Sequence, residues 1–532
     1  DTPQTLAEEA LFAAITKLFP GQPVRRDMDF FNDLGGHSLL AARLTSALRA
    51  DPRFALATVR DIYQQRRIGA IAQALQRGMT TQGAAPERPF TTHSAWRRWR
   101  CGAAQALALP PLMTLKMAQW LAPFFMYHFY TGDPGDSIAF AIGMSLLAFA
   151  VATLAEFVAA WVGHGLIARR LQPGRYPLWG LTYYRWWLTD RLLEGVPIYM
   201  LNGSSLYAAW LRALGAKIGP EVNLGALTVR VPGLLSIGEG TSIGNAVNLE
   251  NARVQGGWLL LGRIDIGANA CIGSYTVVEG DVRVHEYGHV DGQSALASGT
   301  IVPAGRIWSG SPAQDRGAFD IAQQTPRPAV STQRLTWESI AFALGSLFVA
   351  TVFFLPVFPT FLLIDWLDVD AISVRPLLET GTIDATGAFV LRFFKFFALS
   401  LPASLVLIVA TALIAAGIRW AFLPSMKAGT WPVHSNRYLA KWLVNQIQES
   451  SLAVLHGIYA TVYSATWYRL LGAKVGKETE LSTALGLVPD MLTLGDECFI
   501  ADAVMLGDEH VDGGWMTVQP AVASRRSFIG NG

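Results

Sequence analysis

Hydrophobic residues follow three different patterns along the chain, and each pattern predicts a different kind of structure. In residues 1–78 they stand at helical spacing, as in Leu6, Leu11, Ile15 and Leu18, which predicts a small helical domain. Four later stretches are long and nearly uncharged, and two others carry an aliphatic residue at every sixth position. The chain is therefore predicted to be multidomain and of mixed fold class.

The four apolar stretches lie at residues 101–132, 137–155, 339–364 and 396–418. Each is near or above the roughly 20 residues that cross a bilayer core. They form two hairpins with acidic residues in the short loops and Arg and Lys at the other ends, so the positive-inside rule places the short loops outside. This predicts a multi-pass protein of the bacterial inner (cytoplasmic) membrane whose soluble domains are cytoplasmic.

Two features of these regions leave alternatives open. Lys116 and Glu156 stand at membrane depth in the first hairpin, where they either pair with each other or line a substrate path. Residues 179–211 and 438–471 are apolar but carry charges, so they form either amphipathic helices at the membrane or a fifth and a sixth span.

The second half of the chain repeats the first. Leu214-Gly-Ala-Lys217 recurs as Leu471-Gly-Ala-Lys474, and the same offset of 257 residues aligns further matches without a gap. Inside the copies, aliphatic residues followed by small ones recur at a period of six, as at Ile237, Ile243, Leu249, Leu494, Ile500 and Leu506. This period predicts a three-sided parallel β-helix in each copy. The pattern resembles the left-handed β-helix of hexapeptide-repeat acyltransferases.

A motif near the N-terminus carries candidate chemistry. Two glycines bend the chain and Ser38 opens a helix, whose N-terminus favours an attached phosphate, while Leu39 and Leu40 are expected to turn inward. The motif consists of Phe30, Phe31, Leu34, Gly35, Gly36, His37, Ser38 and Leu39. It resembles the four-helix peptidyl carrier (thiolation) domains of non-ribosomal peptide synthetases, which implies a covalent 4′-phosphopantetheine on Ser38. The alternative is a serine that only caps a helix.

Composition narrows the classes of protein. Hydrophobic residues make up 51% of the chain and charged residues 15%, which excludes disorder and favours soluble modules mixed with membrane segments. The net charge of +2 gives no reason to expect nucleic acid as a partner. Cys101, Cys271 and Cys498 are scattered, so neither a disulfide framework nor a metal site is expected.

The order of segments resembles the membrane-embedded C-terminal region of non-ribosomal peptide synthetase-like enzymes of the ε-poly-L-lysine synthetase family. The predicted domains are a carrier at 1–80, a linker at 81–100, a transmembrane hairpin at 101–170, amphipathic helices at 171–213, a left-handed β-helix at 214–320, a second hairpin at 335–420, further amphipathic helices at 435–470 and a truncated second β-helix at 471–532. In that family an adenylation domain precedes the carrier, and the present sequence shows none, so we expect that it does not load itself. The second β-helix stops short of the first, so we expect the chain to be a fragment.

The resemblance implies that an aminoacyl or peptidyl thioester on the carrier is transferred to an amine, forming an amide, either once or iteratively. Such a reaction needs a base near the amine. In an extended segment Asp508, His510 and Asp512 point the same way, which suggests a base with its orienting carboxylates, although the segment could also be a solvated acidic loop. His285 and His289 are candidates in the first copy, and surface positions are the alternative for both.

The predicted partners are an upstream adenylation domain, a phosphopantetheinyl transferase, an amine acceptor, membrane lipids and a second copy in a homodimer. Two further functions compete with amide formation. One is a non-catalytic membrane scaffold that anchors the carrier or forms an export path, and the other is an O-acyltransferase that acts on lipid or glycan.

Overall fold

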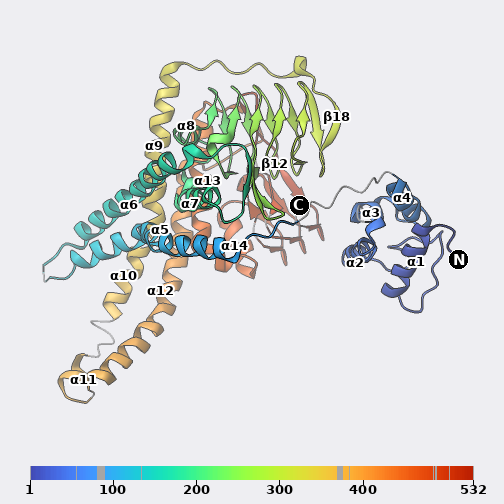
Figure 1. Ribbon diagram of the computed structural model, residues 1–532. Helices are drawn as coiled ribbons and strands as arrows, with labels where there is room; N and C mark the ends of the chain where they lie inside the picture. Colours follow the sequence, from blue (N-terminus) through green and yellow to red (C-terminus); the bar gives the residue numbers. More distant parts are fainter. Residues whose placement is uncertain are drawn as a thin grey trace. The chain divides into compact units, whose positions relative to one another are not determined.

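A computed structural model describes residues 2–54, 57–80, 90–133, 135–367, 375–382, 384–482, 484–485, 488–502, 504–507 and 509–530. The chain divides into two compact units, Asp1–Phe90 and Thr91–Gly532 (Figure 1). Each unit has its own hydrophobic core, so each is described by itself.

The first unit is the predicted four-helix domain. Its helices are α1 (Leu6–Leu18), α2 (Ser38–Arg49), α3 (Val59–Gln65) and α4 (Ile68–Thr80). The apolar stripes predicted from the sequence meet in one core, in which Leu11, Ile15 and Phe30 are fully buried. The expectation for Leu39 is wrong, because its side chain is 56% exposed beside Ser38 while Leu40 packs against the core.

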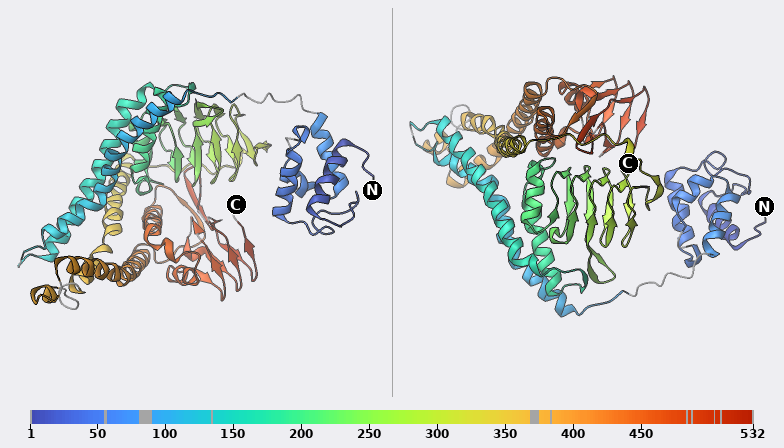
Figure 2. Two further views of the ribbon diagram at one scale, coloured as in Figure 1. Left: turned by 60° about the horizontal axis from the view of Figure 1, so that its bottom comes forward. Right: turned by 90° about the horizontal axis from the view of Figure 1, so that it is seen from above.

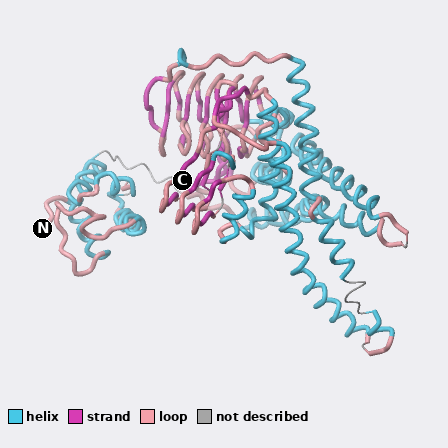
Figure 3. Tube along the Cα trace, turned by 180° about the vertical axis from the view of Figure 1, so that it is seen from behind, coloured by secondary structure: helices cyan, strands magenta, loops and turns pink. Residues whose placement is uncertain are grey.

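The first six-residue pattern forms a three-sided parallel coil, called here coil 1 (Figures 1 and 3). Successive strands join three sheets in rotation, and all but the last strand of the second sheet pair in parallel. The first sheet contains β2 (Lys217–Ile218), β5 (Leu235–Ile237), β10 (Ile264–Ile266), β13 (Val282–Val284) and β16 (Ile301–Val302). The second contains β3 (Asn223–Leu224), β6 (Ser242–Ile243), β11 (Cys271–Ile272), β14 (His289–Val290), β17 (Arg306–Ser309) and β18 (Gln314–Ala318). The third contains β4 (Leu227–Val229), β7 (Val247–Glu250), β12 (Val277–Glu279) and β15 (Ala295–Leu296).

The period of six follows from this geometry. Each side supplies one inward aliphatic, such as Ile237, Ile243 or Leu249, and these side chains stack into the buried core of the coil. A small residue follows because successive turns approach closely at the corners. A Cβ at Gly238, for example, would lie 2.4 Å from the backbone nitrogen of Ala268.

The internal duplication is visible in three dimensions. Coil 2 repeats coil 1 at the offset of 257, with β20 (Lys474–Val475), β21 (Glu480–Leu481), β22 (Ala484–Leu485), β23 (Leu492–Leu494), β24 (Phe499–Ile500), β25 (Val504–Met505), β28 (Ala521–Ala523) and β29 (Phe528–Ile529). Each coil carries a hairpin, β8 (Ala252–Gln255) with β9 (Trp258–Leu261) or β26 (His510–Asp512) with β27 (Trp515–Val518). An outer strand, β1 (Gly174–Pro177) or β19 (Gly429–Pro432), pairs antiparallel with each hairpin. The two coils lie side by side (Figure 2).

Three helical segments are long and apolar enough to cross a membrane: Ile138–Ile167, Thr332–Trp366 and Ala385–Phe422. They correspond to α6 (Ile138–Ile167), to α9 (Thr332–Phe354) continued by α10 (Val357–Trp366), and to α12 (Ala385–Phe422). The fourth predicted span lies in α5 (Ala95–Phe129), which packs along α6 but is not among these candidates. Because α5 begins at Ala95, the last part of the predicted linker is helical, whereas residues 81–89 lie outside the described residues.

The two charged apolar regions form α7 (Leu181–Gly195) with α8 (Ser205–Ala213), and α13 (Asn436–Leu455) with α14 (Val462–Leu470). Neither region is among the candidate spans. Helix α13 packs against both α9 and α12, and its polar residues Gln446 and Ser450 are buried inside the protein. Protein contacts, rather than a membrane surface, therefore cover much of this helix.

A buried ion pair fastens α13 to the loop before β26. The side chain of Lys441 is 1% exposed, and its ammonium group pairs with the carboxylate of Glu509. Two charges taken out of water stabilise a fold only while both are present, because either one alone keeps the cost of desolvation. The pair therefore makes the position of α13 depend on that of the β26 hairpin.

We predict that Lys441→Met lowers the free energy of unfolding by about 3–5 kcal/mol, since it removes the ammonium group that neutralises the largely buried Glu509 carboxylate. Denaturant unfolding of the detergent-solubilised chain measures this loss. The control is Arg283→Met, which removes an exposed pair with Asp265 and is expected to cost less than about 1 kcal/mol. The double variant Lys441→Met/Glu509→Leu should recover much of the loss; equal stability of single and double variants would contradict the prediction.

Candidate functional site

The carrier domain presents Ser38 as the sequence predicts. Ser38 is exposed at the first residue of α2, and its neighbour His37 caps the helix without a side-chain hydrogen bond. Gly35 takes a φ of +71°, and a Cβ at Gly36 would lie 2.4 Å from the carbonyl oxygen of Phe30, so the turn before the serine requires glycine. The first N–H groups of a helix lack intrahelical partners and attract phosphate. The site therefore fits a phosphodiester on Ser38.

A row of polar side chains runs along the outer face of the second sheet of coil 1. Asn223, Ser242, Cys271 and His289 stand opposite one another in register on β3, β6, β11 and β14. They alternate with the inward aliphatics Leu224, Ile243, Ile272 and Val290, so they point away from the core. We call these four side chains the polar row.

Elements of the second repeat cover the polar row. Helix α13 supplies Tyr438, whose hydroxyl accepts a hydrogen bond from the Asn223 amide (2.9 Å) and donates to the Gly203 carbonyl (2.6 Å). Strand β26 lies beside β6. Between these parts is a cavity of about 70 Å³, lined by residues that include Asn202, Cys271, Gln446, Glu449, Glu509 and His510. We call it the acceptor pocket.

The acceptor pocket is rich in hydrogen-bond acceptors. The side-chain oxygens of Asn202 and Gln446 are buried and have no hydrogen-bond partner among the described residues. Glu449 and Glu509 add two carboxylates. Burial and, to a lesser extent, the charge of Glu509 raise the pKa of Glu449 to about 7, while the charge of Lys441 opposes both effects. Unsatisfied buried acceptors are costly, so this arrangement favours a ligand that brings N–H donors and positive charge.

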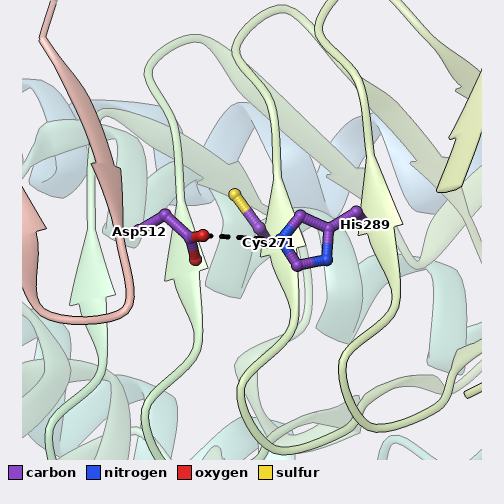
Figure 4. A group of neighbouring side chains, drawn as sticks. All are labelled: Cys271, His289 and Asp512. Carbon is purple, nitrogen blue, oxygen red and sulfur yellow. Dashed lines mark hydrogen bonds and ion pairs between the residues drawn. The ribbon is translucent and has the colours of Figure 1, made fainter. Parts of the chain in front are cut away.

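Next to the pocket, Cys271, His289 and Asp512 converge (Figure 4). Their sulfur, imidazole nitrogen and carboxylate oxygen all lie within 4.8 Å of one another, and His289 Nε2 is 3.5 Å from Asp512 Oδ2. Burial raises the pKa of the Cys271 thiol, and the nearby carboxylates of Asp512 and Asp291 add to this. Burial also raises the pKa of Asp512, but its hydrogen bond with His289 and the charges of His289 and His510 leave that pKa below its usual value.

The structure therefore unites some of the predicted site residues and separates others. His289 and Asp512 meet across the repeats, and His510 is exposed on the wall of the acceptor pocket. His285 is exposed, and no hydrogen bond or ion pair joins it to these residues within the described part of the chain. Asp508 lies outside the described residues. Asp512 thus contacts His289 on the sheet of coil 1, and the predicted grouping of Asp508, His510 and Asp512 stays a prediction.

Two residues of the candidate site, Cys271 and Glu449, were not predicted from the sequence. Cys271 directly precedes the inward Ile272, so the six-residue period itself places it on the outer face. Glu449 lies on α13, and the hydrophobic pattern of this helix does not indicate that other parts of the chain bury it. Both become evident only when the two repeats are packed together.

The ionisable residues of the first hairpin do not form an ion pair. Within the described residues, neither carboxylate oxygen of Glu156 has a hydrogen-bond partner, although the side chain is buried. Lys116 instead lines a second cavity of about 540 Å³ beside α13. That cavity shares Asn245 and Glu449 with the acceptor pocket, so the two hollows adjoin.

Three solved structures show limited similarity to the chain. A hexapeptide-repeat acetyltransferase from Vibrio cholerae is 14% identical, with a TM-score of 0.20 over 32% of this chain and 93% of that one. A maltose O-acetyltransferase from Clostridium difficile 630 is 12% identical, with a TM-score of 0.20 over 32% and 88%. The serine acetyltransferase of Neisseria gonorrhoeae is 17% identical, with a TM-score of 0.18 over 44% and 94%. TM-scores this low do not establish a shared fold. The description of coil 1 depends on its own strand pairing.

Two comparisons of sequence are more informative. Residues 9–75 match the family model described as a phosphopantetheine attachment site. The delta-poly-L-ornithine synthetase of Acinetobacter baumannii (strain AB307-0294) is 44% identical over 533 aligned residues, which cover 100% of this chain and 39% of that protein. The chain thus spans about two fifths of the length of this relative. The resemblance predicted from the sequence is therefore confirmed: the chain carries a phosphopantetheine-attachment carrier domain and is similar along its whole length to part of a poly-amino-acid synthetase.

Proposed function

We propose that this chain forms amide bonds by transferring an aminoacyl or peptidyl group from the carrier on Ser38 to a free amine of a substrate that the acceptor pocket holds by a second, charged amine. When attached, the phosphopantetheine arm supplies the thiol that presents the acyl group as a thioester. The amine nitrogen bonds to the thioester carbonyl carbon, the carbon–sulfur bond breaks, and the amine proton passes to a base on the protein. The observation that supports the proposal is a pocket of buried hydrogen-bond acceptors on the same chain as a carrier domain.

The pocket favours a cationic substrate. The carboxylates of Glu449 and Glu509 and the free side-chain oxygens of Asn202 and Gln446 accept hydrogen bonds, as an alkylammonium group requires. The relative is named for poly-ornithine, whose monomer carries two amines. We therefore propose a basic amino acid such as ornithine as the acceptor, and an adenylation domain and a phosphopantetheinyl transferase as the partners that charge the carrier.

Individual residues receive the following roles. His510, exposed at the wall of the pocket, is the base that takes the amine proton. His289 and Asp512 shape the electrostatic surroundings of the reacting carbonyl. Asp508 stays a predicted orienting carboxylate for His510, two residues away in the sequence. A carrier on the same chain reaches the pocket at a high effective concentration, which favours transfer within the chain.

The same proposal covers the position of the chain in the membrane. We place the apolar helices in the bacterial cytoplasmic membrane, with α5 as a fourth span and the coils and carrier on the cytoplasmic side. We also propose a left-handed sense for both coils, which the six-residue period implies through its resemblance to hexapeptide-repeat acyltransferases. A homodimer stays a prediction.

We predict that His510→Ala slows discharge of the loaded carrier by about 10²-fold or more, because it removes the general base. The experiment loads the full chain with a labelled aminoacyl-pantetheine by means of a phosphopantetheinyl transferase, adds ornithine, and follows release of the label in a single turnover. Ser38→Ala should accept no label.

The control comes from the corresponding hairpin of coil 1. Gln255 lies two residues after Arg253, the counterpart of His510, and is exposed, so Gln255→Ala should discharge as fast as the wild type. Equal rates for His510→Ala and wild type would refute the role of His510. A loaded wild type that discharges to no amine would favour the scaffold function instead.

The ionisation of Glu449 predicts a pH dependence. Its pKa of about 7 means that the carboxylate is mostly neutral at pH 6 and mostly charged at pH 8. An aliphatic diamine stays protonated throughout this range, since its pKa lies near 10. We expect a diamine to bind about tenfold more tightly at pH 8 than at pH 6, measured by titration calorimetry. In Glu449→Gln this dependence should disappear; its persistence would show that another group titrates.

A further inference from the structure

The cluster of Cys271, His289 and Asp512 has the composition of a transition-metal site. Thiolate, imidazole and carboxylate are the three side-chain groups that bind Zn²⁺ in proteins, and catalytic zinc sites use three of them and leave a fourth position open. The three residues come from β11, β14 and β26, and thus from both repeats. We propose that these residues form a binding site for a divalent transition-metal ion, for which Zn²⁺ is the best match.

The distances support this assignment. Zinc bonds of about 2.0–2.3 Å in tetrahedral directions separate neighbouring ligand atoms by roughly 3.3–3.7 Å. His289 Nε2 and Asp512 Oδ2 already stand 3.5 Å apart, and Cys271 Sγ lies within 4.8 Å of both. Register fixes two of the ligands, because Cys271 and His289 are direct partners on adjacent parallel strands. A small rotation of the cysteine side chain completes the triangle.

The surroundings orient the histidine as a ligand. Its Nδ1 lies 3.2 Å from the carbonyl oxygen of Tyr287, which can only accept, so Nδ1 carries the proton and donates. Nε2 faces the Asp512 carboxylate at 3.5 Å, and because a carboxylate oxygen only accepts, a proton or a cation must stand between these two atoms. A backbone carbonyl on the second ring nitrogen is the usual outer partner of a metal-bound histidine.

Neighbouring groups hold the other side chains in place. Phe319 stacks on the His289 ring at a centroid distance of 3.6 Å, and the Gln324 amide donates to Asp512 Oδ2 at 3.3 Å. The Cys271 side chain is nearly buried, and the His289 and Asp512 side chains are 14% and 21% exposed. Limited exposure and fixed side chains favour a single coordination geometry of the metal ion. A sulfur ligand favours zinc or cobalt over magnesium.

The duplication shows that the cluster occurs once among the aligned positions. At the offset of 257, Phe528 stands in place of Cys271 and Gln255 in place of Asp512. Neither replacement retains the thiolate or the carboxylate. The site is therefore specific to the face of coil 1 that β26 covers, beside the acceptor pocket that Cys271 also lines. It does not depend on the proposed reaction.

Cobalt(II) provides the test. The full chain, solubilised in detergent and freed of metal by dialysis against a chelator, is titrated with Co²⁺ and followed by absorption. We expect a thiolate-to-cobalt charge-transfer band and strong d–d bands at one equivalent, and displacement of both by Zn²⁺. Cys271→Ser should abolish the charge-transfer band, and Asp512→Asn should weaken Co²⁺ binding at least about tenfold.

Cys498 offers a matched control, since it is also a buried free cysteine and its sulfur lies 3.0 Å from the carbonyl oxygen of Ser524. Cys498→Ser should retain both bands, and circular dichroism should show that all variants are folded. The proposal is overturned if the wild type gives no thiolate band, or if the band survives Cys271→Ser. Rapid alkylation of Cys271, unchanged by added Zn²⁺, would also overturn it and would indicate a free nucleophilic thiol.

Discussion

The structure of the site depends on one constraint: a polar face of coil 1 is buried by the second repeat. Buried polar groups need partners, and the partners here come from another part of the chain, as in the hydrogen bonds of Tyr438 with Asn223 and Gly203. The Lys441–Glu509 pair then ties α13 to the loop before β26, so helix and hairpin cover the polar row together. Loss of either element would remove hydrogen-bond or ion-pair partners from the other.

The duplication explains how one such face arose from two similar units. Both repeats keep the same framework: Arg212 donates to the carbonyls of Ile218 and Gly219, and Arg469 donates to those of Val475 and Gly476 at the same offset. The functional positions differ, because His510 stands where the first copy has Arg253. Arg253 pairs with Glu279 inside its own coil, which leaves it no part in a contact between repeats. The framework contacts are thus repeated, whereas the candidate site residues differ between the two copies.

The parts that could be predicted from the sequence are those set by local or periodic rules. The carrier motif and the six-residue period each follow from steric demands within a few residues, such as the close approach at Gly238. The carbonyl of Phe30 likewise leaves no room for a side chain at Gly36. The prediction that Leu39 turns inward is wrong, because the packing of an apolar side chain in the core of its own domain does not account for its exposure beside Ser38.

The remaining parts depend on contacts between distant segments. Residues 438–471 look amphipathic, but α9 and α12 cover α13, and this burial raises the pKa of Glu449. Cys271 and Asp512 are 241 residues apart in the chain, and neither forms a motif with its neighbours in sequence. Chemistry assembled across a repeat interface leaves no local pattern, so the sequence indicated His289 and Asp512 separately without indicating that they meet.

The charge of the acceptor pocket constrains the proposed reaction itself. An ammonium group bound to Glu449 and Glu509 has no lone pair and cannot attack a thioester. The attacking amine must therefore be a second, neutral amine on the same molecule, and a monoamine that occupied the pocket would block the reaction rather than take part in it. A base is then needed only for the second amine, which agrees with the place of His510 at the exposed wall and of the carboxylates inside. In the proposed reaction, the pocket therefore selects a diamine through the difference in charge between the two nitrogens of the substrate.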